Sequence, residues 1–213
     1  MAVVTDRREK GRKRQQVVVE AAARAIAELG LANVRVSDIA ERAGMTSGHV
    51  TYYFPSKTDL LMLAIRQSEE SLADLAVAEL AGIDDPWERL ERLIDLSASH
   101  GRGDPGWILW FQVWSDAATD DGAAAVHHEL DGRWRGILRD VLAHGRARGD
   151  FVFDDLDDVA QILSAAIDGL SIQLTAAAPD FDRARMLRLC LHASAALLGG
   201  GPSAAGDRQS GLG

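Results

Sequence analysis

Apolar residues recur along this chain at the three- and four-residue spacing of amphipathic helices, and no segment alternates convincingly as a strand would. The first helix is predicted from Arg14 to Leu29, and Gly30 follows it as a C-terminal glycine cap. A second helix is predicted to begin at Ser37, a favourable N-cap, and to close at Gly44. The chain therefore opens with two helices, the second much shorter than the first.

A third and a fourth helix are separated by a proline. The residues from Ser47 to Phe54 can form about two helical turns before Pro55, because a residue that precedes proline is disfavoured in helical geometry. Ser56 then caps a helix that continues to Leu80 with apolar residues along one side. The fourth helix has the length and pattern of a connecting helix.

Five further helical segments follow Gly82. They are predicted over residues 85–100, 105–119, 122–149, 156–178 and 182–200. The total is about nine helices without a strand, which is an all-α fold. The tail from residue 199 to residue 213 has too few apolar residues to order itself, so we expect it to be flexible.

The two short helices, packed on the first helix and preceded by a basic segment, have the sequence form of a helix-turn-helix. We therefore expect a flexible basic arm over residues 1–13 and a three-helix DNA-binding domain over residues 14–57. The long fourth helix would join this domain to a larger helical domain over residues 58–198. We expect that larger domain to bind a ligand and to form the dimer.

Charge is distributed unevenly along the chain. Residues 1–57 contain ten Lys and Arg against six Asp and Glu, a balance of +4, although the whole chain carries −9. The remainder therefore carries −13, and a basic end on an acidic body is typical of a protein whose first part meets a polyanion. A basic disordered tail is the alternative, but it would explain only the first residues.

The third predicted helix carries the residue types that reading DNA requires. A recognition helix in the major groove needs small and hydrogen-bonding residues at its start, and hydroxyls or cations at its margins for phosphates. Residues of the first kind are Thr46, Ser47, Gly48 and His49, and those of the second kind are Tyr52, Tyr53 and Lys57. Val50 and Phe54 are better placed to pack the helix on its neighbours. In the alternative interpretation the tyrosines are core aromatics and His49 is merely exposed.

The segment from Val36 to Leu61, "VSDIAERAGMTSGHVTYYFPSKTDLL", resembles the DNA-binding signature of the tetracycline-repressor (TetR) family. The matching residues are Ile39, Ala40, Ala43, Gly44, Tyr53, Phe54, Lys57 and Leu60. The resemblance implies base contacts at Ser47, Gly48, His49 and Tyr52, and phosphate contacts at Tyr53 and Lys57. The chain departs from the signature at Arg35 and Val36, where a threonine commonly opens the second helix, and at Thr51, where an aromatic is usual. We expect Ser37 to take over the capping and phosphate-binding role.

Five tryptophans lie beyond residue 82, and three of them fall within eight positions. These rings could line a pocket for a small molecule or could simply fill the core between helices. The candidate pocket residues are Trp107, Trp110, Phe111, Trp114, Trp134, Asp168 and Gln173. This part of the chain also resembles, more loosely, the C-terminal domain of the TetR branch that includes the choline-responsive BetI-type repressors. That resemblance favours the pocket without identifying choline as the ligand.

The last two predicted helices carry the strongest signal for a dimer. Their apolar stripes include small residues that allow close approach, and the residues expected at the interface are Val159, Ile162, Leu163, Ala166, Leu170, Leu187, Leu191, Ser194 and Leu198. The alternative is that both stripes are buried in a monomer. Helix-turn-helix proteins normally pair two recognition helices across two half-sites, and TetR-family members pair through these helices. We therefore expect a homodimer on a palindromic operator.

A small-molecule effector would act through linkage. If it prefers a conformation whose recognition helices are badly spaced, it must weaken DNA binding by the same factor. We expect a repressor that is released in this way, although a corepressor-dependent regulator remains the mirror alternative.

Other classes of protein find little support in the sequence. His127 and His128 lack partners at metal-ligand spacing, and no phosphate-binding glycine loop or nucleophile elbow occurs. We therefore expect no enzyme activity, no metal and no cofactor. A helical interaction module without specific DNA recognition is the second candidate. The single cysteine, Cys190, and the lack of a signal segment or a membrane-spanning run favour a cytoplasmic protein with no membrane partner.

Overall fold

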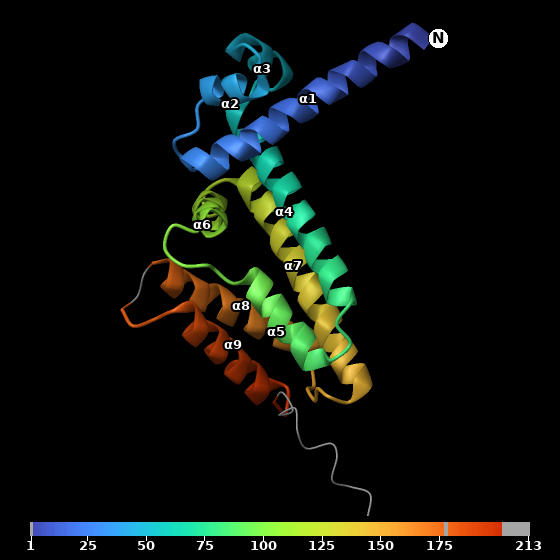
Figure 1. Cartoon of the computed structure of the whole chain (residues 1–213), viewed down its shortest axis with the longest axis vertical. Coiled ribbons are helices and arrows are strands. Elements are labelled where there is room, and N and C mark those ends of the chain that lie inside the picture. The colour runs from blue at the N-terminus through green and yellow to red at the C-terminus, as the bar shows by residue number, and fades with distance from the viewer. Residues whose placement is uncertain (1, 177–178, 202–213) are drawn as a thin grey trace, which may run out of the picture. The chain divides into compact units, whose positions relative to one another are not determined.

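A computed structural model of the chain describes residues 2–176 and 179–201, and within these residues it contains nine α-helices and no strand (Figure 1). The helices are α1 (Ala2–Leu29), α2 (Val36–Ala43), α3 (Ser47–Tyr53), α4 (Lys57–Ala81), α5 (Pro86–Ser97), α6 (Pro105–Ala117), α7 (Asp121–Arg148), α8 (Leu156–Thr175) and α9 (Arg183–Leu197). The predicted all-α fold of about nine helices is confirmed. Residues 202–213 of the predicted flexible tail lie outside the described residues.

The described residues form two compact units. The first unit contains the residues up to Leu72 together with Ile108–Leu130, and the second contains Ala73–Trp107 together with the residues from Asp131 onward. Two long helices, α4 and α7, contribute residues to both units. Each unit has an apolar core of its own.

Small residues on α1 allow the helix-turn-helix to pack closely in the first unit. Val18, Ala22 and Ala25 are fully buried, as is Ile39 of α2. Side chains of this size let the helix axes approach, and α2 and α3 then pack around the same cluster. Val50 of α3 completes the contact with 1 % of its surface exposed. Burial of this apolar face holds α3 in place.

The core of the second unit lies between α5, α7, α8 and α9, with α8 and α9 side by side (Figure 1). Its helices begin at aspartates that accept backbone N–H bonds: Asp85 for α5, Asp155 for α8 and Asp182 for α9. At the end of α7 the chain turns so that Phe151 enters the core and meets Trp87 edge to face at 4.9 Å. These caps and contacts give the unit well-defined helix boundaries.

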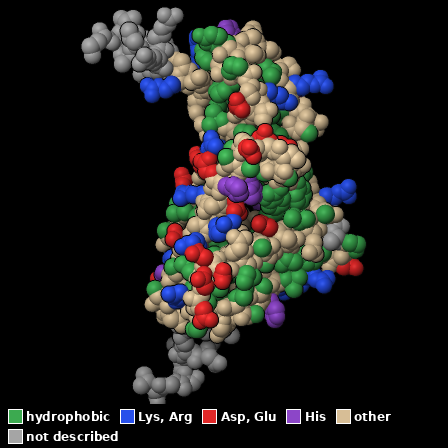
Figure 2. Space-filling view, turned by 180° about the vertical axis from the view of Figure 1, so that it is seen from behind, with side chains coloured by type: hydrophobic (Ala, Val, Ile, Leu, Met, Phe, Trp, Pro, Cys, Tyr) green, Lys and Arg blue, Asp and Glu red, His purple; other side chains and the backbone are tan. Residues whose placement is uncertain are grey.

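Many acidic side chains of the second unit pair with arginines. Arg92 lies 2.6 Å from Glu79, Arg183 lies 2.6 Å from Asp95, and Arg133 lies 2.6 Å from Asp74. On the face shown in Figure 2, acidic and basic side chains are interspersed in the lower half of the view. These pairs offset acidic charges locally, although the net charge of the body is unchanged by them.

Two predicted details of the N-terminal region are wrong. The first helix begins at Ala2 rather than at Arg14, so the described part of the predicted arm is helical. Its sequence contains no proline and is rich in Lys, Arg, Glu and Gln, which are good helix formers. Ser37 does not cap α2, because Val36 is already helical and the Asp38 carboxylate accepts the Arg35 N–H at 2.8 Å. A carboxylate acceptor thus replaces the expected hydroxyl.

Candidate DNA-binding and ligand-binding sites

A left-handed glycine and a threonine cap build the turn between α2 and α3. Gly44 has a φ of +64°, and Met45 N–H donates to the Ala40 carbonyl at 2.9 Å. Thr46 then caps α3, since its hydroxyl accepts the His49 N–H at 3.3 Å. The predicted Gly44 closure and the start of α3 at Ser47 are both confirmed. The turn reverses the chain without a long loop, as a helix-turn-helix requires.

One side of α3 is buried and the other is open. Val50 lies in the core of the first unit and Phe54, just after the helix, packs against it, as predicted. Ser47, Gly48, His49 and Tyr52 lie on exposed positions, and Tyr52 is 80 % exposed. The ring of Tyr52 stands edge to face against Tyr53 at 5.4 Å. A Cβ on Gly48 would meet only the Thr46 hydroxyl, at 3.9 Å. The backbone at the start of α3 is therefore accessible to a large partner.

The flanks of α3 carry the other predicted DNA contacts. Lys57 is exposed in the first turn of α4, and Ser56 caps this helix by accepting the Asp59 N–H at 3.1 Å, as predicted. Ser37 is exposed on the first turn of α2. Exposed hydroxyls and cations near helix starts are suited to phosphate oxygens.

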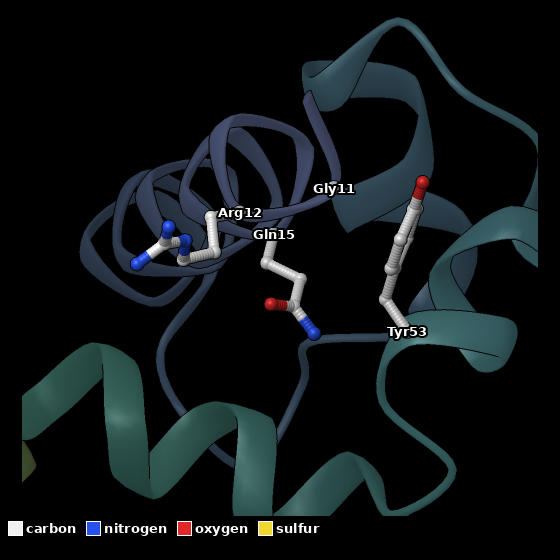
Figure 3. A pocket seen from close by; sticks show the side chains of 4 residues that line it. All are labelled: Gly11, Arg12, Gln15 and Tyr53. Carbon is white, nitrogen blue, oxygen red and sulfur yellow. The ribbon is translucent and has the colours of Figure 1, made fainter. Parts of the chain in front are cut away.

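A pocket of about 440 Å³ lies between α1 and α3. It is lined by Gly11, Arg12 and Gln15 of α1 and by Tyr53, which is half-buried against the core. In the view of Figure 3, Gln15 lies between Arg12 and Tyr53. Sequence reasoning missed Arg12 because it placed residues 1–13 in an arm, and it missed Gln15, in the first predicted helix, because it looked for DNA contacts only on and around the second and third helices. Their three-residue spacing could have revealed that they share a helix face.

Three of the predicted pocket aromatics form a cluster in the first unit. The ring centroid of Trp114 lies 6.0 Å from that of Trp110 and 6.0 Å from that of Phe111. The Trp114 indole N–H donates to Nε2 of His127 at 2.9 Å, and the Trp110 ring stands edge to face against this histidine. All three aromatics are half-buried. Sequence reasoning considered His127 only as a metal ligand and so missed its contact with the tryptophans.

The other four predicted pocket residues belong to the second unit. Trp107 is 8 % exposed and its indole N–H donates to the Ser97 carbonyl at 3.3 Å. Trp134 is half-buried against the core, Asp168 is half-buried and Gln173 is exposed. Neither unit therefore contains all seven residues.

Asp168 is the one predicted pocket residue with a shifted pKa. The pKa of this carboxyl is raised to about 6, chiefly by burial and also by the nearby Asp131 carboxylate, while Arg135 lowers it. Arg135 forms an ion pair with Asp131, one turn away on α7. Trp134 follows Asp131 by three residues, so the two share a face of α7. The second unit thus brings two carboxylates close to each other on α7 and α8, with a tryptophan on the same face of α7 as one of them.

The predicted dimer residues differ in how far they are buried. Val159, Leu163, Ser194 and Leu198 are buried within the second unit. The half-buried residues are Ala166, Leu170, Leu187 and Leu191, whereas Ile162 is 51 % exposed. Two exposed apolar residues were not predicted, Ile172 on α8 and Leu189 on α9. Only part of the predicted set is thus exposed on the outer surface of α8 and α9.

The N-terminal and the C-terminal part of the chain each match a known protein family. Residues 18–63 match the tetR family of bacterial regulatory proteins, and residues 86–199 match the C-terminal domain of BetI-type transcriptional repressors. The transcriptional regulator BetI 1 of Chromohalobacter salexigens is 30 % identical over 82 % of this chain and 86 % of its own length. BetI of Rhizobium meliloti is 32 % identical over 75 % of this chain and 77 % of its own.

A similar solved structure is a transcriptional regulator from Saccharomonospora viridis in complex with choline. It is 33 % identical, has a TM-score of 0.73, and covers 83 % of this chain and 92 % of its own. A TetR transcription regulator from Haloarcula marismortui is 23 % identical with a TM-score of 0.74 over 87 % of this chain and 98 % of its own, and it shows the same fold. These relatives are regulators rather than enzymes. Among the described residues, no helix is long and apolar enough to cross a membrane.

Proposed function

Since this chain belongs to the TetR family of transcriptional regulators and has a BetI-type C-terminal domain, we propose that it is a repressor that binds a palindromic operator as a homodimer and is released by a small cation. The observation that carries the DNA-binding part is the two-sided character of α3. Its Val50 face is buried, while Ser47, His49 and Tyr52 are exposed beside an uncovered Gly48. An exposed polar face on a short, firmly packed helix is suited to the major groove.

The backbone contacts of the operator would surround α3. Tyr53 and Arg12 line the pocket next to α3, while Lys57 lies at the start of the following helix. Cations and hydroxyls in these places can bind phosphates on either side of the groove and so set the register of the recognition helix. Base contacts would then come from His49, Ser47 and Tyr52.

The outer surface of α8 and α9 supports the homodimer. Ile162, Ile172 and Leu189 are exposed there, next to half-buried apolar residues such as Leu170 and Leu187. Two copies of this surface would form a self-complementary interface of the kind that two-fold dimers use. The buried residues Val159, Leu163, Ser194 and Leu198 would support that surface from within and would not contact the partner.

The carboxylates of α7 and α8 support a cationic effector. Asp131 is already paired with Arg135, whereas Asp168 is held in surroundings that disfavour its charge. A bound organic cation would compensate this charge, and Trp134 could contribute the face of an aromatic ring. The relative from Saccharomonospora viridis was solved in complex with choline, which makes a quaternary ammonium compound the first candidate.

Linkage between the two functions follows from differential affinity. A cation that prefers a conformation unsuited to the operator lowers DNA affinity, and DNA lowers the affinity for the cation by the same factor. The helix α4 runs continuously from Lys57 to Ala81 and contributes residues to both units, so it is the element to examine for such coupling.

The test of DNA recognition is selection of duplexes from a random library, followed by binding of the winner at several salt concentrations. We expect a palindrome, an affinity that falls steeply with salt, and a loss of binding in Tyr52→Ala and Lys57→Ala. Arg102→Ala removes an exposed cation from the second unit and is the matched control. Failure to enrich any sequence, with all variants alike, would favour the helical interaction module instead.

The test of the effector is titration of choline into the free protein and into the protein–operator complex, for wild type and for Asp168→Asn. We expect choline to bind the wild type, to release the operator, and to do neither in the variant. Gln161→Ala, which changes an exposed residue of the same helix outside the candidate pocket, is the control. Tighter operator binding on addition of choline would instead identify a corepressor.

A further inference from the structure

Thr46 and His49 make two contacts at the start of α3, and both use the same hydroxyl. The Thr46 hydroxyl accepts the backbone N–H of His49 at 3.3 Å and lies 3.1 Å from Nδ1 of the His49 ring. Within the described part of the chain, the Thr46 hydroxyl is the polar group that contacts the imidazole ring of His49. The side chain of His49 is otherwise exposed. The N-cap therefore also holds the imidazole.

A hydroxyl carries one proton and two acceptor sites. One acceptor site of Thr46 is occupied by the backbone N–H of His49, and the proton of the hydroxyl remains available for the ring nitrogen. Donation from this hydroxyl to Nδ1 requires that Nδ1 carry no proton, which leaves the proton of the neutral imidazole on Nε2. Acceptance of an Nδ1–H by the second acceptor site would go with the other tautomer, so the direction of this hydrogen bond and the position of the ring proton are one question.

With the Thr46 hydroxyl as donor, His49 presents a donor of its own to the partner of α3. Nδ1 then accepts from Thr46, and the outward nitrogen, Nε2, carries the hydrogen. His49 is on the exposed side of the helix, and Tyr52 lies one turn further on the same side. The hydroxyl of Thr51, between them in the sequence, is directed back to the helix and donates to the Ser47 carbonyl at 2.9 Å. His49 is therefore placed to offer a single, oriented N–H to a base.

We propose that His49 reads a guanine of the operator by donating from Nε2, and that Thr46 is the positioning residue that sets its ring. Guanine presents two adjacent acceptors, N7 and O6, in the major groove. Adenine presents one acceptor beside a donor, and thymine one acceptor beside a methyl group. A lone N–H donor is best matched by guanine. This inference rests on the proposed DNA-binding function and adds the base class that one side chain reads.

The first experiment replaces each guanine of the selected operator in turn by 7-deazaguanine, which lacks N7, and by 6-thioguanine, in which a weakly accepting sulfur replaces O6; both analogues still pair with cytosine. We expect one symmetry-related pair of positions at which an analogue weakens wild-type binding roughly three- to tenfold per half-site. His49→Ala should bind the natural operator more weakly and should not respond to the analogue at that position. Ser47→Ala should still respond, because it leaves His49 and Thr46 intact.

The second experiment tests the role of Thr46 without DNA, by ring-nitrogen NMR of the free protein at a pH where His49 is neutral. Wild type and Thr46→Ser should both carry the proton on Nε2, because each has a hydroxyl at this position. Thr46→Asp keeps an acceptor for the backbone N–H but cannot donate, so it should move the proton to Nδ1. A merely structural cap would leave the tautomer the same in all three.

The outcomes separate this inference from the proposed function. Specific operator binding without an analogue effect that depends on His49 overturns the guanine contact and leaves the regulator intact. A wild-type ring with its proton on Nδ1 overturns the role of Thr46. If no duplex is selected at all, the DNA-binding proposal fails and this inference fails with it.

Discussion

Gly145 lies near the end of α7 at a place where a larger residue cannot fit. A Cβ built on it would lie 2.1 Å from Cδ2 of Phe151, a buried ring that packs against Trp87. The Gly145 carbonyl also accepts the N–H groups of Asp150 and Phe151 at 3.0 Å and 3.2 Å. The glycine therefore lets the chain fold back so that Phe151 enters the core.

Gly145→Ala is expected to lower the free energy of unfolding by about 1–3 kcal/mol, because the added methyl group overpacks the core. Gly132→Ala in the same helix meets nothing within 4 Å and should raise stability by up to about 1 kcal/mol through helix propensity. Urea unfolding of both variants checks this pair. An increase in stability for both would contradict the contact with Phe151.

Asp168 makes stability depend on pH. Its pKa in the folded protein is about 6, above the ordinary value of 3.8, so the folded state binds the proton more tightly. Stability from this group is complete below about pH 4 and is lost as the pH rises through 6. The shift of about two pKa values corresponds to roughly 2–3 kcal/mol.

Asp168→Asn should therefore be more stable than wild type by roughly 2–3 kcal/mol near pH 7.5, and the difference should shrink toward pH 4. Urea unfolding at a series of pH values measures the difference. A gap that stays constant from pH 4 to pH 7.5 would show that the carboxyl is not held in surroundings that disfavour its charge.

At the scale of secondary-structure elements, ion pairs connect three helices of the second unit, α4, α5 and α9. Arg92 of α5 contacts Glu79 of α4 at 2.6 Å, and Asp95 accepts from both Arg92 and Arg183, the first residue of α9. Arg183 also donates to the Asp95 carbonyl at 2.8 Å. The side chains in this network are one-quarter to one-half exposed, so solvent weakens each pair, but Asp95 joins two of them.

Asp95→Ala should lower the free energy of unfolding by about 1–2 kcal/mol, because it leaves two arginines without their shared carboxylate. Glu91→Ala removes an exposed carboxylate from the same helix and should have little effect. Thermal unfolding at low and high salt distinguishes the two variants, since only the loss of stability in Asp95→Ala should depend on salt. Equal and small effects would mean that the network does not join α5 to α9.

At the scale of the whole molecule, the proposed homodimer depends on the exposed apolar residues of α8 and α9. Ile162→Asp places a charge on the most exposed of the large apolar residues of α8 and α9 and should raise the dissociation constant of the dimer at least about tenfold. Val152→Asp changes an apolar residue that is more exposed, 69 % against 51 %, but lies outside these helices. Sedimentation equilibrium measures both. A monomeric wild type, or equal effects of the two variants, would overturn the proposed interface.

The local sequence was sufficient for the helices and for the DNA-reading motif. Apolar spacing, the left-handed Gly44, the Thr46 cap and the Ser56 cap act within a few residues of one another, so their effects can be read without the rest of the chain. The prediction that Ser37 caps α2 was wrong. Its hydroxyl and the Asp38 carboxylate are both acceptors near the start of this helix, and it is the carboxylate that accepts the Arg35 N–H. The family signature was recognisable for the same local reason.

Contacts between distant segments could be seen only in the packed chain. A helical apolar stripe shows that a face is buried but not what covers it, so the sequence could not tell that Val159 and Leu163 pack inside their own unit. For the same reason the sequence could not show that the tryptophans divide between two units. Nor could it show that Arg12 lines a pocket together with Tyr53, forty-one positions further along the chain. Helix formation depends on neighbours in the sequence, whereas packing depends on residues that become neighbours only on folding.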